Sequence, residues 1–268
     1  MNEYGTIAGH AANASQAEYP HLWRGLIGLW VPSAGNTGSQ LVDYTPNNNW
    51  CWEFGSMPSW VPGRRGLATR FGGSAGWVCN SNNITSGLSA VTFMCWAKQD
   101  TLDSIAGIYQ KAANTGTNAI LFETYNDGNL YFEVNNGSNQ YTSFDYSTII
   151  SANVWFHAAT VFDGSLANNS RLKIYINGRL ITTTSTAAVP ATLPTNTANF
   201  ILGLYGANQA WNGLLDDMRL YNRALTAKEI WQSYTMPSPL VRSPEVYGKA
   251  VAAAAGAQNW HYYHQMMS

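Results

Sequence analysis

The sequence predicts an all-β protein built as an antiparallel β-sandwich. Short runs of alternating apolar and polar residues recur along the chain, and turns rich in Gly and Asn separate them, as at residues 126–129 and 135–137. Hydrophobic residues make up 46% of the 268 residues and aromatic residues 13%, which is enough to fill the core of a full sandwich. One short helix is expected, close to the C-terminal end of the domain.

Alternation places most of the strands. They are expected at residues 26–31, 66–73, 76–79, 91–98, 105–111, 119–125, 130–134, 140–144, 154–164, 172–182 (a hairpin), 199–205 and 213–221. Asn177 and Gly178 form the two-residue turn of the hairpin. In the strand at 91–98 both faces are apolar, so we expect both faces to be covered. Residues 50–63 are rich in Trp and Pro and do not alternate, which predicts an irregular, packed loop.

The strand at 213–221 and the helix after it carry the most information. Alternation would put one set of side chains on each face of the strand. One set is Leu214, Asp216, Met218 and Leu220, and the other is Leu215, Asp217, Arg219 and Tyr221. A carboxylate on an apolar face is costly, so Asp216 is expected to accept backbone N–H groups from a loop or to bind a cation. Asp217 has Arg219 on its own face, and Thr226 with Glu229 forms a capping box for the helix.

The run from Gly213 to Leu225 resembles the closing strand and helix of the laminin-G-like, concanavalin A-type jelly roll. The strands at 66–73, 91–98 and 154–164 and the hairpin at 172–182 are similar to that family as well. The resemblance implies a concanavalin A-like (laminin-G-like) antiparallel β-sandwich jelly roll with a short C-terminal helix and extended terminal arms. It says little about the ligand, because one fold hosts many functions.

Three regions are expected along the chain. Residues 1–20 are small or polar and form an N-terminal arm, residues 21–236 form the jelly roll, and residues 237–268 form a Pro/Ala-rich tail. A free tail seldom carries several aromatic side chains together. Trp260, Tyr262 and Tyr263 are therefore expected to contact a partner or the domain itself.

Composition excludes several classes of function. Charged residues are only 11% of the chain, against about 25% in a typical globular protein, and the net charge is −1. Nothing here suits a phosphate backbone, so nucleic acid is not an expected partner. No stretch is long and apolar enough for a membrane span, and no signal peptide is visible, so synthesis is expected in the cytoplasm. Of the three cysteines, Cys95 is expected in the core, whereas Cys51 and Cys79 are expected as free thiols, with a disulfide between them as the alternative.

Calcium is the one cofactor that the residues suggest. Asp43 lies in the loop at 41–50, where the family that the chain resembles carries an Asp. Here Pro46 and three Asn residues replace the family's glycines, and an Asx-turn role is the alternative for Asp43. Asp216 is the second candidate ligand, because of the cost of burying it.

An aromatic platform is the candidate glycan site. Trp50, Trp52 and Trp60 lie within one short region, where they could stack on sugars, serve a protein interface or pack as a loop. A small charged fraction and many Asn, Ser, Thr and Tyr residues also suit sugar recognition.

Catalysis is not expected. A glycoside hydrolase needs two carboxylates across a cleft, but the acidic residues here are scattered, and Glu123 and Glu133 could face each other across a hairpin as any solvent-face pair could. His157 shares a face with Trp155, Ala159 and Val161 and is expected to be a core residue. No nucleophile elbow, zinc signature or phosphate loop is present.

The sequence therefore predicts a non-enzymatic protein. Its opening, Leu-Trp-Arg-Gly-Leu at residues 22–26, and its tail resemble laminin-G-like proteins of phages and prophages. The resemblance implies a structural, decoration or tail-associated protein of the virion that displays a jelly roll to glycans or a host surface. Capsid or tail subunits and further copies of the chain are then the expected partners. A free-standing carbohydrate-binding or adhesion domain is the alternative, and a glycoside hydrolase comes third.

Overall fold

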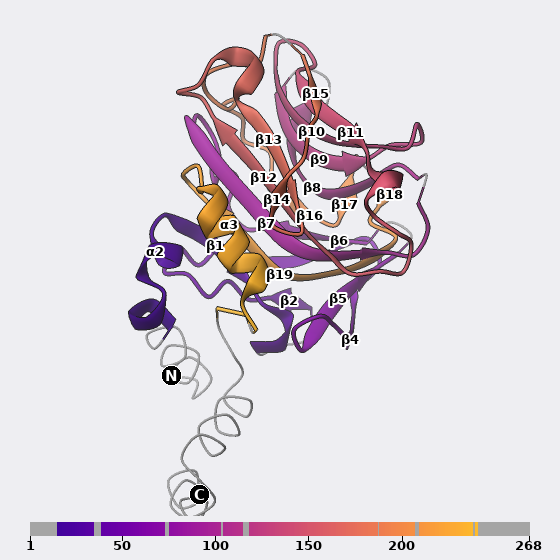
Figure 1. The fold of residues 1–268 in the computed structure, drawn as a ribbon. Coiled ribbons are helices and arrows are strands. Elements are labelled where there is room, and N and C mark those ends of the chain that lie inside the picture. The colour runs from indigo at the N-terminus through magenta and orange to yellow at the C-terminus, as the bar shows by residue number, and fades with distance from the viewer. Residues whose placement is uncertain are drawn as a thin grey trace, which may run out of the picture.

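The computed structural model describes residues 15–34, 39–72, 75–102, 104–114, 118–186, 188–206, 209–237 and 239–240. In these ranges the chain forms two β-sheets that pack face to face (Figure 1). All strand pairs are antiparallel except the contact of one short strand, and the predicted all-β sandwich is therefore confirmed.

The first sheet contains the strands of the closing motif. Its order is β14 (Arg179–Leu180), β13 (Leu172–Ile176), β12 (Phe156–Asp163), β7 (Ala90–Gln99), β19 (Gly213–Tyr221), β5 (Leu67–Phe71) and β4 (Ser59–Pro62). Strand β1 (Leu26–Trp30) pairs with the second half of β19.

The second sheet is larger. Its order is β15 (Thr184–Ser185), β11 (Tyr141–Asp145), β10 (Asn129–Asn136), β9 (Asn118–Thr124), β8 (Ala106–Asn114), β16 (Ile201–Leu202), β6 (Gly76–Cys79), β3 (Cys51–Phe54) and β2 (Gln40–Leu41). Strands β17 (Leu204–Tyr205) and β18 (Gln209–Ala210) join it beside β8.

The helices of the described ranges lie against the first sheet. Helix α2 (Pro20–Trp23) and helix α3 (Ala227–Thr235) lie on its outer side (Figure 1), and short 3-10 turns occur at Pro32–Ala34, Tyr146–Thr148 and Asn168–Ser170. The predicted capping box of α3 is confirmed, because Thr226 and Glu229 each accept the other's backbone N–H. None of the helices in the described ranges has the length and apolar character needed to cross a bilayer.

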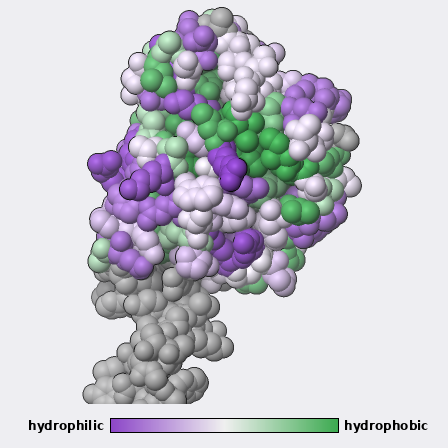
Figure 2. Space-filling view, in the orientation of Figure 1, coloured by the Kyte–Doolittle hydropathy of each residue, from purple (hydrophilic) through white to green (hydrophobic). Residues whose placement is uncertain are grey.

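The first sheet is buried on both faces, as the apolar pattern of β7 predicts. Phe93, Cys95 and Ala97 point into the core between the sheets. Met94, from the other face of β7, packs in a second apolar cluster with residues of α2, β1 and α3. On the surface, hydrophobic groups gather over the upper part of the view in Figure 2, and hydrophilic groups surround them.

Strict alternation along β19 is wrong. A β-bulge shifts the pairing of β19 with β7 between Asp216 and Arg219, and Asp217 adopts a left-handed conformation with φ of 49°. Because of this extra residue, Met218 points into the core like Leu215, which lies before the bulge. Asp216 and Asp217 therefore both lie on the outer face, beneath α3.

Two further expectations are corrected. Residues 50–63 do not form an irregular loop, because they contain β3 and β4. Both strands lie at or next to a sheet edge, where Pro62 is tolerated and strict alternation is not required. Cys51 and Cys79 are joined by a disulfide rather than free, since they lie directly opposite each other on β3 and β6.

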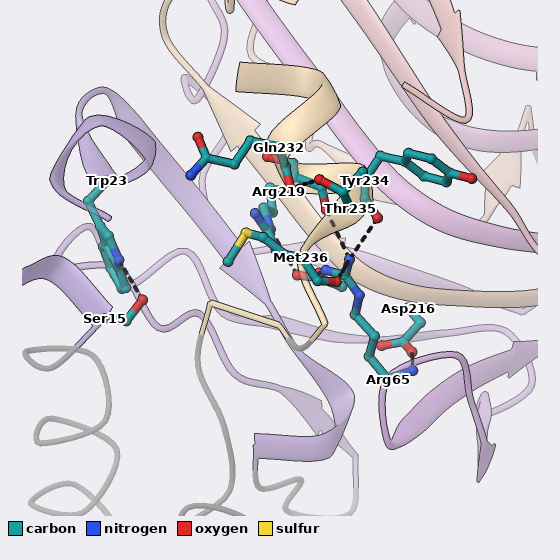
Figure 3. A network of polar contacts seen from close by, with 11 residues as sticks. Ser15, Trp23, Arg65, Asp216, Arg219, Gln232, Tyr234, Thr235 and Met236 are labelled. Atoms are coloured by element: carbon teal, nitrogen blue, oxygen red, sulfur yellow. Dashed lines mark hydrogen bonds and ion pairs between the residues drawn. The ribbon is translucent and has the colours of Figure 1, made fainter. Parts of the chain in front are cut away.

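A buried ion cluster fastens α3 to the first sheet (Figure 3). Asp217 binds Arg65 at 2.6 Å and Arg219 at 2.7 Å through its Oδ2. Arg65 also donates from Nη2 to the carbonyl oxygens of Ser233, Tyr234 and Met236, where α3 ends, at distances of 2.6–3.2 Å. Burial acts to raise the pKa of Asp217, but the two guanidinium groups overcome it and lower that pKa to about 2.

Asp216 also helps to attach α3 to the first sheet, because it holds the backbone of Arg65. Its Oδ2 accepts the backbone N–H of Arg65 at 2.7 Å, which confirms the predicted bond to a loop. One aspartate thus fixes the backbone of this loop, and its neighbour fixes the side chain that reaches the end of α3.

We expect Asp217→Asn to lower the free energy of unfolding by about 3–5 kcal/mol, because it leaves two buried guanidinium groups without their counter-charge. Urea unfolding of the variant and the parent protein measures this difference. The matched control is Asp100→Asn, which breaks the partly exposed Arg70–Asp100 ion pair and should cost under about 1 kcal/mol. Equal losses in the two variants would contradict this role for Asp217.

Candidate functional site

The outer face of the second sheet carries a polar, aromatic pocket. It encloses about 250 Å³ and is lined by Glu123, Tyr125, Asp127, Tyr131, Glu133, Asn139, Tyr141 and Tyr205. These residues come from β9, β10, β11 and β17 and from the turns beside them.

The register of β10 explains why these side chains meet. Leu130, Phe132 and Val134 point into the core, so the residues between them point outward. Tyr131 lies opposite Glu123 of β9, and Glu133 lies opposite Tyr141 of β11. The alternation of one central strand thus brings two carboxylates and two tyrosines onto the same patch.

Gly107 allows Tyr205 of β17 to form one side of the pocket. It lies opposite Glu123 on β8, and a Cβ at this position would overlap the backbone of Leu204 and Tyr205. The absence of a side chain lets β17 approach β8 closely. Tyr205 can therefore line the pocket beside Glu123.

The Tyr131 ring makes edge-to-face contacts with two other tyrosine rings. Tyr131 meets Tyr125 with ring centroids 6.0 Å apart and an interplanar angle of 72°, and it meets Tyr141 at 5.2 Å and 69°. The hydroxyl of Tyr131 donates to Asp127 Oδ2 at 2.6 Å, which fixes the ring. The three rings therefore present both faces and edges around one space.

Glu123 is the unusual group of the pocket. The residue is only 2% exposed, and its Oε2 has no hydrogen-bond partner among the described residues. Burial, together with the charge of Glu133, raises the pKa of Glu123 to about 9. Burial also raises the pKa of Glu133, although Asn135 donates to its Oε2 at 2.9 Å. None of the described residues that line the pocket is Lys or Arg.

This arrangement suits recognition better than hydrolysis. Glycosidases place their two carboxylates on either side of the bond that they break. Glu123 and Glu133 instead project from neighbouring strands on one face of one sheet. The pocket offers ring faces for stacking and hydroxyl, amide and carboxyl groups for hydrogen bonds.

We expect Glu123→Gln to stabilise the protein at alkaline pH. The pKa of Glu123 rises from 4.5 in the unfolded chain to about 9 in the fold. Between these pH values the folded state holds a proton that the unfolded state has lost, so its stability falls as pH rises. The variant should be more stable than the parent by about 1–3 kcal/mol at pH 8 and indistinguishable near pH 4.

Thermal and urea unfolding between pH 4 and pH 9 measure this effect. Glu53→Gln on β3 of the same sheet is the control, and it should leave the pH dependence unchanged. A parallel pH dependence in the Glu123→Gln variant and the parent would contradict the assignment.

The predicted calcium ligands are engaged in other bonds. Both oxygens of Asp43 accept two hydrogen bonds each, from the backbone N–H groups of Leu29, Thr45 and Asn49 and from the Thr45 hydroxyl, at 2.7–2.9 Å. This is the Asx-turn alternative, and it leaves no lone pair directed at a cation. Asp216 accepts the backbone N–H of Arg65 through Oδ2, and its Oδ1 has no hydrogen-bond partner among the described residues, but the positive charge of Arg65 disfavours a cation there. These donors therefore do not fit calcium, and the described ranges contain no group of three or more His, Cys, Asp or Glu that could hold a metal.

The three tryptophans of the predicted platform do not share one surface. Trp50 and Trp52 contact each other edge to face at 5.7 Å, and Trp52 is 36% exposed. Trp60 instead lies on the other sheet, stacks on buried Trp77 at 5.3 Å and packs against the core. The structure thus brings together two of the three rings.

His157 lies in the interior, as predicted. Burial and the nearby Arg219 and Arg65 lower its pKa to about 3, so it is neutral, and its Nδ1 finds no partner within the described ranges. The predicted assembly residues Trp260, Tyr262 and Tyr263 lie outside the described residues.

Reasoning from sequence missed the tyrosines of the pocket. Tyr125, Tyr131, Tyr141 and Tyr205 match no motif, and Glu123 and Glu133 look like any pair of solvent-face acids. The available signal was that β10 alternates Leu-Tyr-Phe-Glu-Val, which marks Tyr131 and Glu133 as outward neighbours.

Comparison with known proteins gives a family and a fold. Residues 71–231 match the family described as the concanavalin A-like lectin/glucanases superfamily. Domain 4 of an extracellular arabinanase from Geobacillus stearothermophilus, solved with arabinotriose, is 21% identical with a TM-score of 0.55, and the match covers 77% of this chain and 97% of that domain. A search of curated proteins found no significant match.

Two toxin domains have the same fold. The binding domain of Paraclostridial Mosquitocidal Protein 1 is 20% identical with a TM-score of 0.59, covering 80% of this chain and 52% of that one. The receptor-binding domain of a botulinum neurotoxin C/D mosaic is 18% identical with a TM-score of 0.60, covering 79% and 51%. The chain spans about half the length of these two toxin domains.

Proposed function

Because the chain belongs to the concanavalin A-like lectin/glucanases superfamily, we propose that it is a non-catalytic glycan-binding domain whose ligand occupies the tyrosine-lined pocket of the second sheet. Family membership agrees with the laminin-G-like resemblance of the run around Asp216 and Asp217. The observation that carries the proposal is the pocket itself.

The chemistry of the lining supports a sugar ligand. Sugars present apolar C–H faces, which pack on aromatic rings, and hydroxyl groups, which need hydrogen-bond partners at fixed positions. Tyr125, Tyr131 and Tyr141 supply the rings, and Asn139, Asp127 and the two glutamates supply donors and acceptors. The volume of about 250 Å³ suits one or two sugar rings rather than a long chain. The arabinanase domain, which was solved with arabinotriose, supports a sugar ligand for this fold.

The pocket lies on the sheet that the helices of the described ranges do not cover. Helices α2 and α3 lie on the outer side of the first sheet (Figure 1), where a second hollow of about 310 Å³ opens between Arg64, Trp96 and the end of α3. The described residues that line that hollow include two arginines and no carboxylate, so it lacks the ring-and-carboxyl chemistry of the tyrosine-lined pocket. A ligand approaching the sandwich from the side of the second sheet meets the pocket without any rearrangement of these helices.

A glycan array probed with the whole protein tests the proposal. We expect binding to a restricted set of glycans, and we expect Tyr131→Ala to weaken binding at least about ten-fold, which corresponds to about 1.4 kcal/mol. Trp52→Ala is the informative comparison, because it removes the exposed half of the Trp50–Trp52 pair and should leave binding unchanged. Loss of binding in Trp52→Ala alone would move the site to that pair, and an array without any signal would refute glycan binding.

We further propose that this jelly roll is displayed on a phage virion, as a structural, decoration or tail-associated component. The resemblance of residues 22–26 and of the tail to phage and prophage proteins supports this context, as does the aromatic end at residues 260–263. Capsid or tail subunits and further copies of the chain are then the partners, and the pocket would face a host surface.

Solution mass by light scattering tests this second proposal. We expect the full chain to form a defined oligomer and a chain trimmed to residues 15–240 to be a monomer. The trimmed chain keeps Leu240, which is buried in the cluster beside α3, so its fold should persist, and circular dichroism checks this. If the full chain and the trimmed chain are both monomers, assembly through the terminal segments is contradicted.

A further inference from the structure

We propose that the pocket selects saccharides that carry a free, protonated amine, so that an amino sugar whose nitrogen is not acylated is the preferred ligand. This inference rests on the proposed glycan-binding function and names the class of sugar that the same site takes.

The pocket lacks a positive charge among its described residues. Three carboxyl groups line it, those of Glu123, Asp127 and Glu133, and none of the described lining residues is Lys or Arg. Asp127 is exposed and accepts hydrogen bonds from Tyr131 and Asn129, and Asn135 donates to Glu133, but these donors are neutral. Buried Asp217, by contrast, has two guanidinium groups. Buried charges in proteins are ordinarily paired. A cation supplied by the ligand would complete the pocket as Arg65 and Arg219 complete the cluster on the first sheet.

Within the described ranges, Glu123 has an oxygen atom without a hydrogen-bond partner. The residue is 2% exposed and lines the pocket, yet its Oε2 has no hydrogen-bond partner among the described residues. An unpaired buried acceptor is costly, so it marks a position that a donor should occupy. An ammonium group offers up to three N–H donors and a positive charge to this oxygen and to the nearby carboxylate of Glu133.

The tyrosine rings line the pocket in different orientations. Tyr125 and Tyr141 are inclined to Tyr131 by 72° and 69°, and all three residues line the pocket. A cation is attracted to the face of an aromatic ring, and the attraction grows when water is excluded. Aromatic rings together with a neighbouring carboxylate form a binding site for an ammonium group. Aromatic rings without a carboxylate would stack on any sugar and would not select an amine.

A neutral or acidic sugar fits less well. A hydroxyl or an acetamido group in place of the amine leaves Glu123 and Glu133 without a counter-charge. A sugar carboxylate would add a further acid beside three carboxyl groups and would bring no positive charge. We therefore expect the pocket to distinguish sugars by the presence of this amine.

Binding should be coupled to proton release. The ionisable groups facing Glu123 are Glu133, Asp127 and the tyrosines of β10, β11 and β17, while β8 places Gly107 opposite it. None of these groups stabilises the charged form of Glu123, so the unliganded pocket holds a proton there at neutral pH. A bound ammonium group favours the carboxylate, and Glu123 then gives its proton to the solvent.

The experiment compares three β-1,4-linked tetrasaccharides that differ only at carbon 2: glucosamine, N-acetylglucosamine and glucose. Calorimetry at pH 6, where the amine is protonated, is run with the full chain in two buffers of different ionisation enthalpy. We expect the glucosamine tetramer to bind at least ten-fold more tightly than the other two and to release a proton on binding.

Two variants locate the effect. Glu123→Gln keeps the shape of the side chain and should abolish both the preference for glucosamine and the proton release. Glu53→Gln on β3 lies outside the pocket and should change neither. Retention of the preference and of proton release in Glu123→Gln would overturn the role of Glu123.

The outcomes separate this inference from the proposed function. Equal binding of all three tetramers, or tighter binding of a neutral one, overturns the inference and leaves glycan binding standing. No saccharide binding here or on the array overturns both. The last ligand to be tested is choline, which carries a fixed positive charge but no sugar ring. If choline binds as tightly as the glucosamine tetramer, the pocket binds ammonium groups in general. That result would contradict the assignment of a sugar ligand.

Discussion

The bulge at Asp216 and Asp217 is the constraint on which the arrangement of the first sheet depends. One extra residue in β19 turns two consecutive acids to the same side, where one holds the backbone of Arg65 and the other holds its guanidinium. Arg65 in turn binds the carbonyl groups at the end of α3. The closing strand, the loop before β5 and the last helix thereby become one unit. Left-handed backbone at a non-glycine residue is costly, and the two arginine partners of Asp217 offset that cost.

That unit decides which face of the sandwich is free. Helices α2 and α3 and the apolar cluster beneath them cover the first sheet, so its central strands β7, β12 and β19 are buried on both sides. Within the described ranges no helix lies on the outer side of the second sheet, whose central strand β10 alternates between core residues and the outward pair Tyr131 and Glu133. The polar, aromatic pocket thus forms on the sheet that the closing motif leaves open, while the Asp217 cluster lies on the covered sheet as part of the framework.

Much of the fold could be predicted because alternation and turn residues are local signals. The bounds of β6 and β19 and the capping box of Thr226 and Glu229 follow from a few neighbouring residues. The features that were predicted wrongly depend on pairing between segments that are distant in the sequence. The bulge at Asp217 exists because β7 and Arg65 select it, and the bond of Cys51 with Cys79 needs the register of β3 on β6. The pocket was missed for the same reason, since Tyr131 and Tyr205 meet only through the sheet and through Gly107.

The buried acids of this protein differ in their partners. Asp216 and Glu123 each have one oxygen without a hydrogen-bond partner among the described residues, and burial raises the pKa of both, but Asp216 has Arg65 beside it, whereas none of the described lining residues supplies Glu123 with such a cation. Asp43 and Asp217 are buried with a full set of donors or counter-charges, as expected of groups kept for stability. Glu123 is buried as deeply, yet one oxygen is unpaired, and its carboxylate form lowers stability as pH rises. A glutamine there would serve the fold better. A buried acid that works against stability is expected where binding rather than folding sets the requirement, and under the proposed function the ligand would bring the partner that Glu123 lacks.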